Sequence, residues 1–241
     1  MTSLYAEHVH LYDRAFGWDI SEEVDWLLAR LGPDCSTVLE PACGAGRYLA
    51  AFGERGVEAV GFDREPAMVS AASRRGDAVV ADLASFALGR TFDGAICPVG
   101  TLALLPSNDA ARHLDCMGRH LVSGARYLIQ LAMRDPDDPE AALHSSSWER
   151  AGVRVVWATE EVDLDHAIER QRSRLEVLDG PGAGRIVETH VVTAWTPISW
   201  AELVGASPFD LAATYDGERQ GRPRVGPGSV GRLLWHELER S

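Results

Sequence analysis

Apolar and polar positions in the first half of the chain follow two alternating patterns. Between residues 19 and 31, apolar side chains such as Val24, Leu27 and Leu31 recur at the spacing of an amphipathic helix. Short runs that are apolar throughout, such as 94–97, are typical of strands buried on both faces. These patterns predict strands at 36–40, 57–62, 78–81, 92–97 and 125–132, and helices at 19–31, 47–55, 65–75 and 108–121. Strands that alternate with helices indicate a parallel sheet joined by right-handed crossovers.

The pattern changes after residue 132. A polar segment with prolines at 134–140 precedes three segments with strand character, and a turn is expected at 179–182. A short helix at 199–203, capped by Ser199, and two further strands complete the chain. The predicted strands of this half are 153–158, 172–178, 186–195, 209–215 and 230–237. The simplest architecture is an α/β sheet with an antiparallel insertion after its fifth strand, closed by a terminal strand pair.

Composition narrows the chemistry. All 23 basic residues are arginine, which excludes mechanisms that need a lysine amine, such as a pyridoxal phosphate Schiff base or a Walker phosphate loop. The net charge of −13 disfavours nucleic acid as a partner. Neither a membrane-spanning apolar stretch nor a signal peptide is expected, and the four cysteines are widely spaced. A cytoplasmic location with free thiols is therefore expected.

The segment from 38 to 47 carries the most specific signal. A predicted strand ends at Glu40, and Gly44-Ala45-Gly46 then forms a Gly-x-Gly turn that opens a helix. Glycines let the backbone pass close to a ligand, and the first helical turn offers free N–H groups. Asp63 ends the second strand, where a carboxylate can hold two ribose hydroxyls, and Asp82 follows the third strand. Three acidic residues at the carboxyl edge of one sheet predict a nucleoside site.

The glycine turn has two other interpretations. A dinucleotide fingerprint needs a third small residue five positions after the first glycine, and Leu49 occupies that position. A bulky side chain there opposes the close packing of helix and strand that a pyrophosphate loop requires. An ordinary tight turn of an α/β protein is the other interpretation. The acidic residues after the strands favour a nucleoside site without a phosphate clamp.

These residues resemble the class I S-adenosylmethionine-dependent methyltransferases. The resemblance covers 38–132 and is most specific in 39–47, 61–68, 81–83 and 92–97. Within that family the chain is most similar to small bacterial amino-sugar N,N-dimethyltransferases, which share an early Tyr-Asp pair, here Tyr12-Asp13, and a Tyr-Asp-Gly near the C-terminus, here Tyr215-Asp216-Gly217. The resemblance implies S-adenosylmethionine as the cofactor. It also implies a Rossmann-like seven-stranded methyltransferase sheet with helices on both faces and an antiparallel β insertion after the fifth strand.

For the methionine end of the cofactor, the resemblance implies five residues. Ala42, Gly44 and Gly46 would pack along the methionine moiety, and Glu40 would organise the turn. Tyr12 would close over the methionine carboxylate from the N-terminal segment.

For the adenosine end, the resemblance implies residues after the second and third strands. Asp63 would bind the ribose hydroxyls, and Arg64 or Met68 would flank the adenine. Asp82 would accept a hydrogen bond from the adenine amino group, and Leu83 would supply a backbone contact.

The acceptor side departs from the amino-sugar enzymes. Pro98, after the fourth strand, would lie near the transferable methyl group. Those enzymes often carry a histidine a few residues later, and Leu104 takes its place here. No residue is singled out as the general base, and no metal site is expected. The candidate histidines are His113, His120, His144, His166 and His190.

The tryptophans have two interpretations. They pack a small lid core, or some of them line an acceptor pocket between lid and sheet. Those in or beside the insertion are Trp148, Trp157, Trp195 and Trp200, and Trp18 and Trp26 lie in the N-terminal segment. In the second interpretation the tryptophans supply apolar walls, and Leu102 and Leu104 make the segment after the fourth strand apolar as well. A small and largely apolar acceptor is then predicted.

The expected function is methyl transfer to oxygen or nitrogen of such a molecule in specialised metabolism. The alternative is a protein of the same fold that binds the cofactor but acts as a cyclase or a non-catalytic assembly partner. Expected partners are a small-molecule acceptor and neither nucleic acid nor membrane, with a homodimer as a candidate assembly. The expected domains are an N-terminal helical cap at 1–35, a cofactor-binding core at 36–133, a β insertion acting as a substrate lid at 140–195, and a completion of the core sheet at 196–241.

Overall fold

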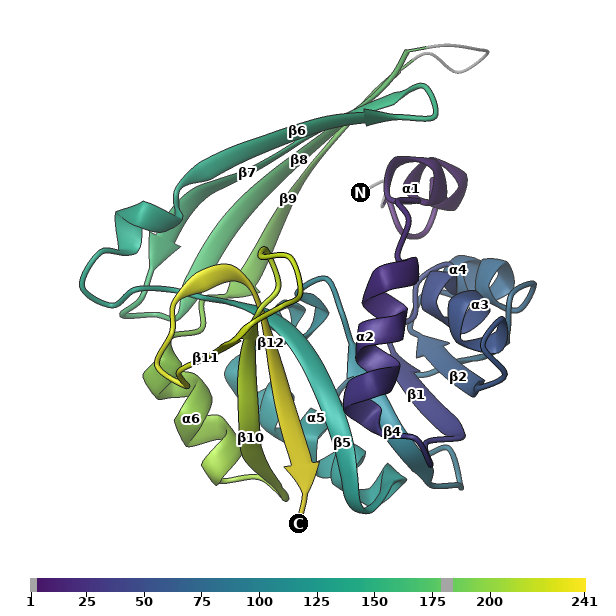
Figure 1. Cartoon of the computed structure of the whole chain (residues 1–241). Helices are drawn as coiled ribbons and strands as arrows, with labels where there is room; N and C mark the ends of the chain where they lie inside the picture. The colour runs from purple at the N-terminus through teal and green to yellow at the C-terminus, as the bar shows by residue number, and fades with distance from the viewer. Residues whose placement is uncertain (1–3, 179–183) are drawn as a thin grey trace.

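Two β-sheets organise the chain in a computed structural model that describes residues 4–178 and 184–241 (Figure 1). The strands of the larger sheet are β1 (Thr37–Pro41), β2 (Glu58–Asp63), β3 (Asp77–Val80), β4 (Phe92–Cys97), β5 (Leu121–Met133), β10 (Phe209–Asp216), β11 (Arg224–Val225) and β12 (Gly231–Arg240). Their order in the sheet is β11-β10-β12-β5-β4-β1-β2-β3. Strands β1 to β5 pair in parallel, and β10, β11 and β12 add antiparallel pairs.

The predicted α/β class with an antiparallel insertion is confirmed, but each of the two sheets has one strand more than predicted. The larger sheet has eight strands because the two-residue strand β11 pairs with the end of β10. A strand of two residues is too short to leave a pattern in the sequence. The turn predicted at 179–182 lies outside the described residues.

Helices cover both faces of the larger sheet. They are α2 (Ser21–Leu31), α3 (Arg47–Gly53), α4 (Pro66–Ala72), α5 (Ser107–His120) and α6 (Pro197–Gly205), whereas α1 (Val9–Ala15) packs on the smaller sheet. On one face, Leu27 of α2 and Phe52 of α3 pack with Val38 of β1. On the other face, Leu114 of α5 and Trp200 of α6 share a core with Leu39. The neighbouring residues Val38 and Leu39 of β1 thus enter opposite cores, which explains why both are apolar.

The start of α6 corrects a detail of the prediction. The N-cap is Thr196, whose Oγ1 accepts a hydrogen bond from the backbone N–H of Ser199 at 3.2 Å. The Ser199 hydroxyl in turn accepts from the N–H of Thr196 at 3.0 Å. Ser199 is therefore the third helical residue of a capping box and not the cap itself.

The smaller sheet is antiparallel and lies across from the larger one, with α1 beside it (Figure 1). Its strands are β6 (His144–Arg150), β7 (Val153–Asp163), β8 (Ile168–Val177) and β9 (Arg185–Thr193). Phe16 and Leu11 pack with Val155 and Leu175 of this sheet. The indole Nε1 of Trp148 donates a hydrogen bond to the carbonyl of Ala15 at 2.8 Å. The N-terminal segment is therefore bound to the smaller sheet. Within the described residues, no helix is long and apolar enough to cross a membrane.

Candidate functional site

The glycine turn between β1 and α3 has backbone conformations that few residues adopt. Ala42, Gly44 and Gly46 all have positive φ angles, of 51°, 55° and 80°. A Cβ atom on Gly46 would lie 2.9 Å from the Cα of Ala72, so glycine is required both by conformation and by the close approach of α4. The backbone N–H of Cys43 donates to the carbonyl of Phe62 at 2.9 Å, which ties the turn to the end of β2.

Asp63 holds the same turn from the end of β2. Its Oδ2 accepts a hydrogen bond from the backbone N–H of Gly44 at 3.0 Å, and its Oδ1 accepts one from Glu65 at 2.9 Å. Burial raises the pKa of Asp63, and the two backbone N–H groups oppose that shift. Each carboxylate oxygen has a further lone pair, so the side chain can still accept two hydroxyl groups of a ligand.

Glu40 is the least solvated acid of the site. Its side chain is 3% exposed, and Oε2 has no hydrogen-bond partner among the described residues. Burial raises the pKa of Glu40 to about 8, Arg47 lowers it, and Asp63 raises it further. Buried polar atoms without a partner are rare in folded proteins, and each needs an explanation. A cationic group of a ligand would supply the missing partner, so the site fits the ammonium group of S-adenosylmethionine.

Tyr12 of α1 lies over the glycine turn. Its ring is 3.7 Å from the position that a Cβ of Gly44 would take, and it stacks on Phe16 with ring centroids 4.8 Å apart. Burial raises the pKa of Tyr12 to about 12, so the phenol is neutral at every physiological pH. The guanidinium of Arg47, at the start of α3, donates to the carbonyl of Phe16 and fixes the end of α1 beside the turn.

A second aromatic residue of this cover was missed in the sequence. The ring of Tyr5 lies 5.6 Å from Tyr12 and meets His190 of β9 edge-on at 6.4 Å. Tyr5 therefore connects the cover of the glycine turn with the smaller sheet. The spacing of Tyr5, Tyr12 and Phe16 could have indicated a shared face, but only if the short helix α1 had been recognised.

The adenosine-side residues lie after β2 and β3, in different surroundings. Asp82 is exposed, and its Oδ1 accepts from the N–H of Ala84 at 2.8 Å. Leu83 is 8% exposed. Met68 is 1% exposed and packs in a cluster that includes Tyr12. The side chain of Arg64 is 76% exposed and pairs with Glu65 at 3.3 Å, so the structure does not bring Arg64 to the turn.

Pro98 is buried directly after β4, and hydrogen bonds fix the backbone around it. The N–H of Val99 donates to Oε1 of the buried Gln130 at 2.8 Å, and the Thr101 hydroxyl donates to the carbonyl of Pro98 at 2.9 Å. Leu104 lies in the 3₁₀ helix η1 (Thr101–Leu104) and is 49% exposed. The backbone after β4 is therefore held rigidly at the same edge of the sheet.

Two of the candidate histidines of α5 have structural partners. His113 Nδ1 lies 2.8 Å from the carbonyl of Leu83, and its Nε2 lies 2.8 Å from the hydroxyl of Tyr127. His120 accepts from the N–H of Leu88 at 2.9 Å. Burial lowers the pKa of His113 to about 4, so it stays neutral. These two rings attach the segment after β3 to α5.

The remaining candidates lie in or near the smaller sheet. His144 Nδ1 lies 2.8 Å from the carbonyl of Ala142, and His166 is paired with Asp163 at 2.8 Å on the surface. His190 is half-buried, and its ring stacks on Trp157 with centroids 4.8 Å apart. Among the five, His190 is the one that contacts the N-terminal cover. Within the described ranges 4–178 and 184–241, no group of three or more His, Cys, Asp or Glu residues could hold a metal ion.

The seven tryptophans divide among three clusters, and Trp26 packs with Trp235 in the core on the α2 side of the larger sheet. Trp195 and Trp200 belong to the core of the larger sheet, where they are 3% and 0% exposed. Trp18, Trp148 and Trp157 pack around Phe16 between α1 and the smaller sheet. Trp18, Trp148 and Trp157 therefore pack a core between α1 and the smaller sheet, and the lining of an acceptor pocket stays a prediction.

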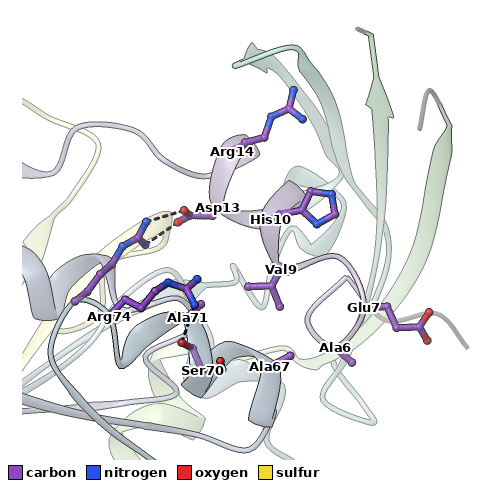
Figure 2. A pocket seen from close by; sticks show the side chains of 11 residues that line it. Ala6, Glu7, Val9, His10, Asp13, Arg14, Ala67, Ser70, Ala71 and Arg74 are labelled. Atoms are coloured by element: carbon purple, nitrogen blue, oxygen red, sulfur yellow. Dashed lines mark hydrogen bonds and ion pairs between the residues drawn. The ribbon is translucent and has the colours of Figure 1, made fainter. Parts of the chain in front are cut away.

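A groove with a volume of about 590 Å³ lies between α1 and α4 (Figure 2). None of the predicted cofactor residues lines it, so it marks the seam where α1 docks on α4. Asp13 lies at this seam and forms a two-pronged ion pair with Arg75, at 2.7 and 2.6 Å. Arg75 also donates to the carbonyl of Ala45 at 3.1 Å, within the glycine turn. One guanidinium thus joins α1 to the turn.

We expect Arg75→Gln to loosen α1. Hydrogen exchange of the α1 amides should become about two- to fivefold faster, the range expected for a partly exposed ion pair. Mass spectrometry of exchange with and without S-adenosylhomocysteine measures this, and bound ligand should slow exchange near Tyr12. Arg74→Gln is the matched control, because Arg74, which follows α4, donates to the carbonyl of Ser70 at 3.0 Å and acts on Asp13 only through its charge. Equal exchange in the two variants would contradict the role of Arg75.

Comparison with known proteins identifies the central part of the chain. Residues 38–124 match the model of a methyltransferase domain family. The chain is 27% identical over 207 residues to a dTDP-4-amino-2,3,4,6-tetradeoxy-D-glucose N,N-dimethyltransferase of Saccharopolyspora spinosa, covering 81% of this chain and 82% of the relative.

Solved structures share the whole architecture. An S-adenosylmethionine-dependent methyltransferase of Clostridium acetobutylicum is similar with a TM-score of 0.79 at 15% identity, covering 99% of this chain and 100% of the other. An amino pentose methyltransferase of calicheamicin biosynthesis from Micromonospora echinaspora, with S-adenosylmethionine bound, is similar with a TM-score of 0.74 at 20% identity, covering 100% of both chains. The predicted resemblance to S-adenosylmethionine-dependent methyltransferases is confirmed.

Proposed function

We propose that this S-adenosylmethionine-dependent methyltransferase methylates the amino nitrogen of a small, polar, amino-sugar-like molecule in specialised metabolism. The observation that carries the acceptor class is the match over 81% of the chain to an enzyme named as a sugar N,N-dimethyltransferase. That match extends beyond the methyltransferase domain at 38–124 and includes segments that form the smaller sheet. This coverage supports an acceptor of the same chemical class.

The unpartnered Glu40 and the glycine turn support the assignment of the methionine end. Glu40 would pair with the ammonium group of the cofactor, and Ala42, Gly44 and Gly46 would let the backbone approach its methionine moiety. Tyr12 would cover this end from α1. In this assignment Asp63, and not Glu40, organises the turn, since Asp63 accepts the hydrogen bond from Gly44.

The adenosine end would lie along the segments after β2 and β3. Asp63 would accept the ribose hydroxyls, and Asp82 would accept from the adenine amino group beside the backbone of Leu83. Met68 would flank the adenine from the cluster in which it packs with Tyr12. Arg64 would flank the adenine only after a movement of its exposed side chain. The dinucleotide alternative is further disfavoured by Leu49, which is 1% exposed and fills the position that a small residue would need.

The cofactor supplies a methyl group on a positively charged sulfur, which is already activated for displacement. The residues of this chain mainly have to align the acceptor with that group, and alignment alone can supply roughly 7–11 kcal/mol of the barrier. The rigid backbone around Pro98 would form one wall of the reaction site, and Tyr5 and Tyr12 would exclude water from it.

A largely apolar acceptor is the second candidate, and a specific observation favours it. Leu104, where amino-sugar enzymes often carry a histidine, is 49% exposed at the end of η1 and offers an apolar surface. A role as cyclase or non-catalytic assembly partner is the third candidate. Incubation with the labelled cofactor distinguishes the three.

The test uses three acceptors: dTDP-4-amino-2,3,4,6-tetradeoxy-D-glucose; benzylamine, an alkylamine whose body is an apolar aromatic ring; and tRNA. We expect methylation of the amino sugar, detected by mass spectrometry as one or two added methyl groups. Methylation of the apolar amine alone would favour the second candidate. Binding of the cofactor without turnover of any acceptor would favour the third. Methylation of tRNA would contradict the exclusion of nucleic acid.

Location and assembly belong to the same proposal. We place the reaction in the cytoplasm, away from membranes, where the cofactor is made and where Cys35, Cys43, Cys97 and Cys116 stay as free thiols. The assembly would be a homodimer. The N-terminal cap at 1–35 and the insertion at 140–195 would serve as the covers of the core.

A further inference from the structure

The inner face of the smaller sheet consists of three cross-strand rows with different chemistry. In an antiparallel sheet, residues directly opposite one another point to the same face. The first row is apolar and holds α1, and the next two rows are mostly polar. The rows are Trp148, Val155, Leu175 and Ile186; then Ser146, Trp157, Ser173 and Glu188; then His144, Thr159, Gln171 and His190.

A continuous network connects the polar rows to a buried ion pair. Arg134, which follows β5, binds both oxygens of Glu169 at 2.7 and 2.8 Å, and the two side chains are 5% and 2% exposed. Thr159 and Gln171 donate to the same carboxylate at 3.0 and 2.7 Å. The indole of Trp157 donates to Gln171 at 2.9 Å. The polar rows are therefore rigidly anchored to the end of the larger sheet.

His190 is half-buried and contacts this network through the ring of Trp157. Its Nε2 lies 2.9 Å from the Ser173 hydroxyl, its ring is parallel to Trp157 within 7°, and Nδ1 has no hydrogen bond among the described residues. Burial lowers the pKa of His190, so the ring is neutral near pH 7. A neutral imidazole with one nitrogen engaged offers the other to a ligand.

The polar rows lie between the two parts of the reaction site. On one side His190 contacts Tyr5, which leads through Tyr12 to the glycine turn. On the other side β9 ends at Thr193, whose hydroxyl donates to the carbonyl of Leu105 at 2.7 Å, in the segment that follows Pro98 and η1. A lid that only excluded water could be apolar throughout, as its first row is. Burying polar groups is costly unless they are hydrogen-bonded, and the network supplies those bonds in the polar rows.

We propose that the two polar rows are the binding surface for the acceptor, and that His190 selects polar acceptors by a hydrogen bond from Nδ1 to a hydroxyl or amino group. The inference rests on the proposed function, because it assigns the part of the site that receives the amino sugar. It makes the smaller sheet the element that decides acceptor class, while the larger sheet binds the cofactor.

The test compares His190→Leu with the wild type in direct binding by calorimetry, without cofactor, and in the KM for acceptor. Probes are dTDP-4-amino-2,3,4,6-tetradeoxy-D-glucose, benzylamine and S-adenosylhomocysteine. We expect about tenfold weaker binding of the amino sugar, the usual effect of one lost hydrogen bond in a buried site, with the other two probes unchanged. Val191→Ala, on the outward face of the same strand and 52% exposed, is the matched control.

Two outcomes would contradict the role of His190, and a third would contradict the proposed function. Equal weakening of all three probes would show that His190 is structural, and unchanged binding of the amino sugar would remove it from the acceptor surface. A wild-type protein that binds no amino sugar would contradict the proposed function instead. Should His190→Leu fail to fold, Ser173→Ala removes only the hydroxyl beside Nε2, and a severalfold rise in KM for the amino sugar alone is expected.

Discussion

Asp63→Ala is expected to weaken the binding of S-adenosylmethionine and S-adenosylhomocysteine by about a hundredfold or more. The variant loses a carboxylate that can accept two hydroxyl groups, and hydrogen bonds to a charged group contribute roughly 1.5–3 kcal/mol each. It also loses the hydrogen bond from Gly44 that holds the glycine turn. Both effects act on the same ligand, so this should be the largest loss of affinity among single substitutions of the site.

Calorimetric titration of the purified variants measures the effect. Asp63→Asn keeps an oxygen for the N–H of Gly44 but not the charge, so its affinity should lie between that of the alanine variant and the wild type. Asp77→Ala is the control, since Asp77 is an exposed carboxylate at the opposite end of the neighbouring strand β3. Unchanged affinity in a folded Asp63→Ala variant would remove Asp63 from the site.

Apart from the largely exposed edge strand β3, the parallel strands of the larger sheet could be predicted because they are buried on both faces. Such strands are apolar throughout, and β1 and β4 show this in a few consecutive residues. β6 could not be predicted, because Ser145, Ser146 and Ser147 give it no apolar side. The seven-residue helix α1 also escaped, since a helix this short is stabilised by its packing on the smaller sheet and not by its own sequence.

Some residues of the site could likewise be predicted from the sequence, and others could not. The conformations of Gly44 and Gly46 and the place of Asp63 follow from a local motif, in which a strand, a turn and a helix are consecutive. Arg75 could not be found, because its partner Asp13 lies 62 residues away. The connection of Tyr5 to His190 likewise depends on how two distant segments dock. The roles of these residues toward the cofactor stay predictions until binding is measured.

Glu40→Gln is expected to stabilise the cofactor-free protein while it weakens cofactor binding. Folding raises the pKa of Glu40 from 4.5 to about 8, so the unfolded chain loses this proton at a lower pH than the folded one. The unfavourable contribution of Glu40 to stability is therefore absent below about pH 4.5, and it grows as the pH rises toward about 8. With about 1.4 kcal/mol per pKa unit, Glu40 costs roughly 3 kcal/mol near pH 7.

Urea unfolding of wild type and Glu40→Gln between pH 5 and pH 8 measures this cost. The free energies of unfolding should differ by about 1 kcal/mol at pH 5 and by roughly 3 kcal/mol at pH 7, with the variant more stable at both. Parallel curves across this range would contradict the buried, protonated state of Glu40. Ser36→Ala, a change outside the site at the start of β1, should not alter the slope and serves as the control.

Bound cofactor should turn Glu40 from a destabilising into a stabilising residue. Ionised Glu40 would pair with the cofactor's ammonium group, so binding to the wild type should release a proton near pH 7, and affinity should rise with pH up to about 8. Calorimetry in two buffers with different ionisation enthalpies measures the released proton. Glu40→Gln should bind S-adenosylhomocysteine more weakly and release no proton at this site. A buried acid that destabilises the cofactor-free protein, and whose cost the ligand offsets, is typical of a binding site. A purely structural Glu40 would show the difference in stability without the release of a proton.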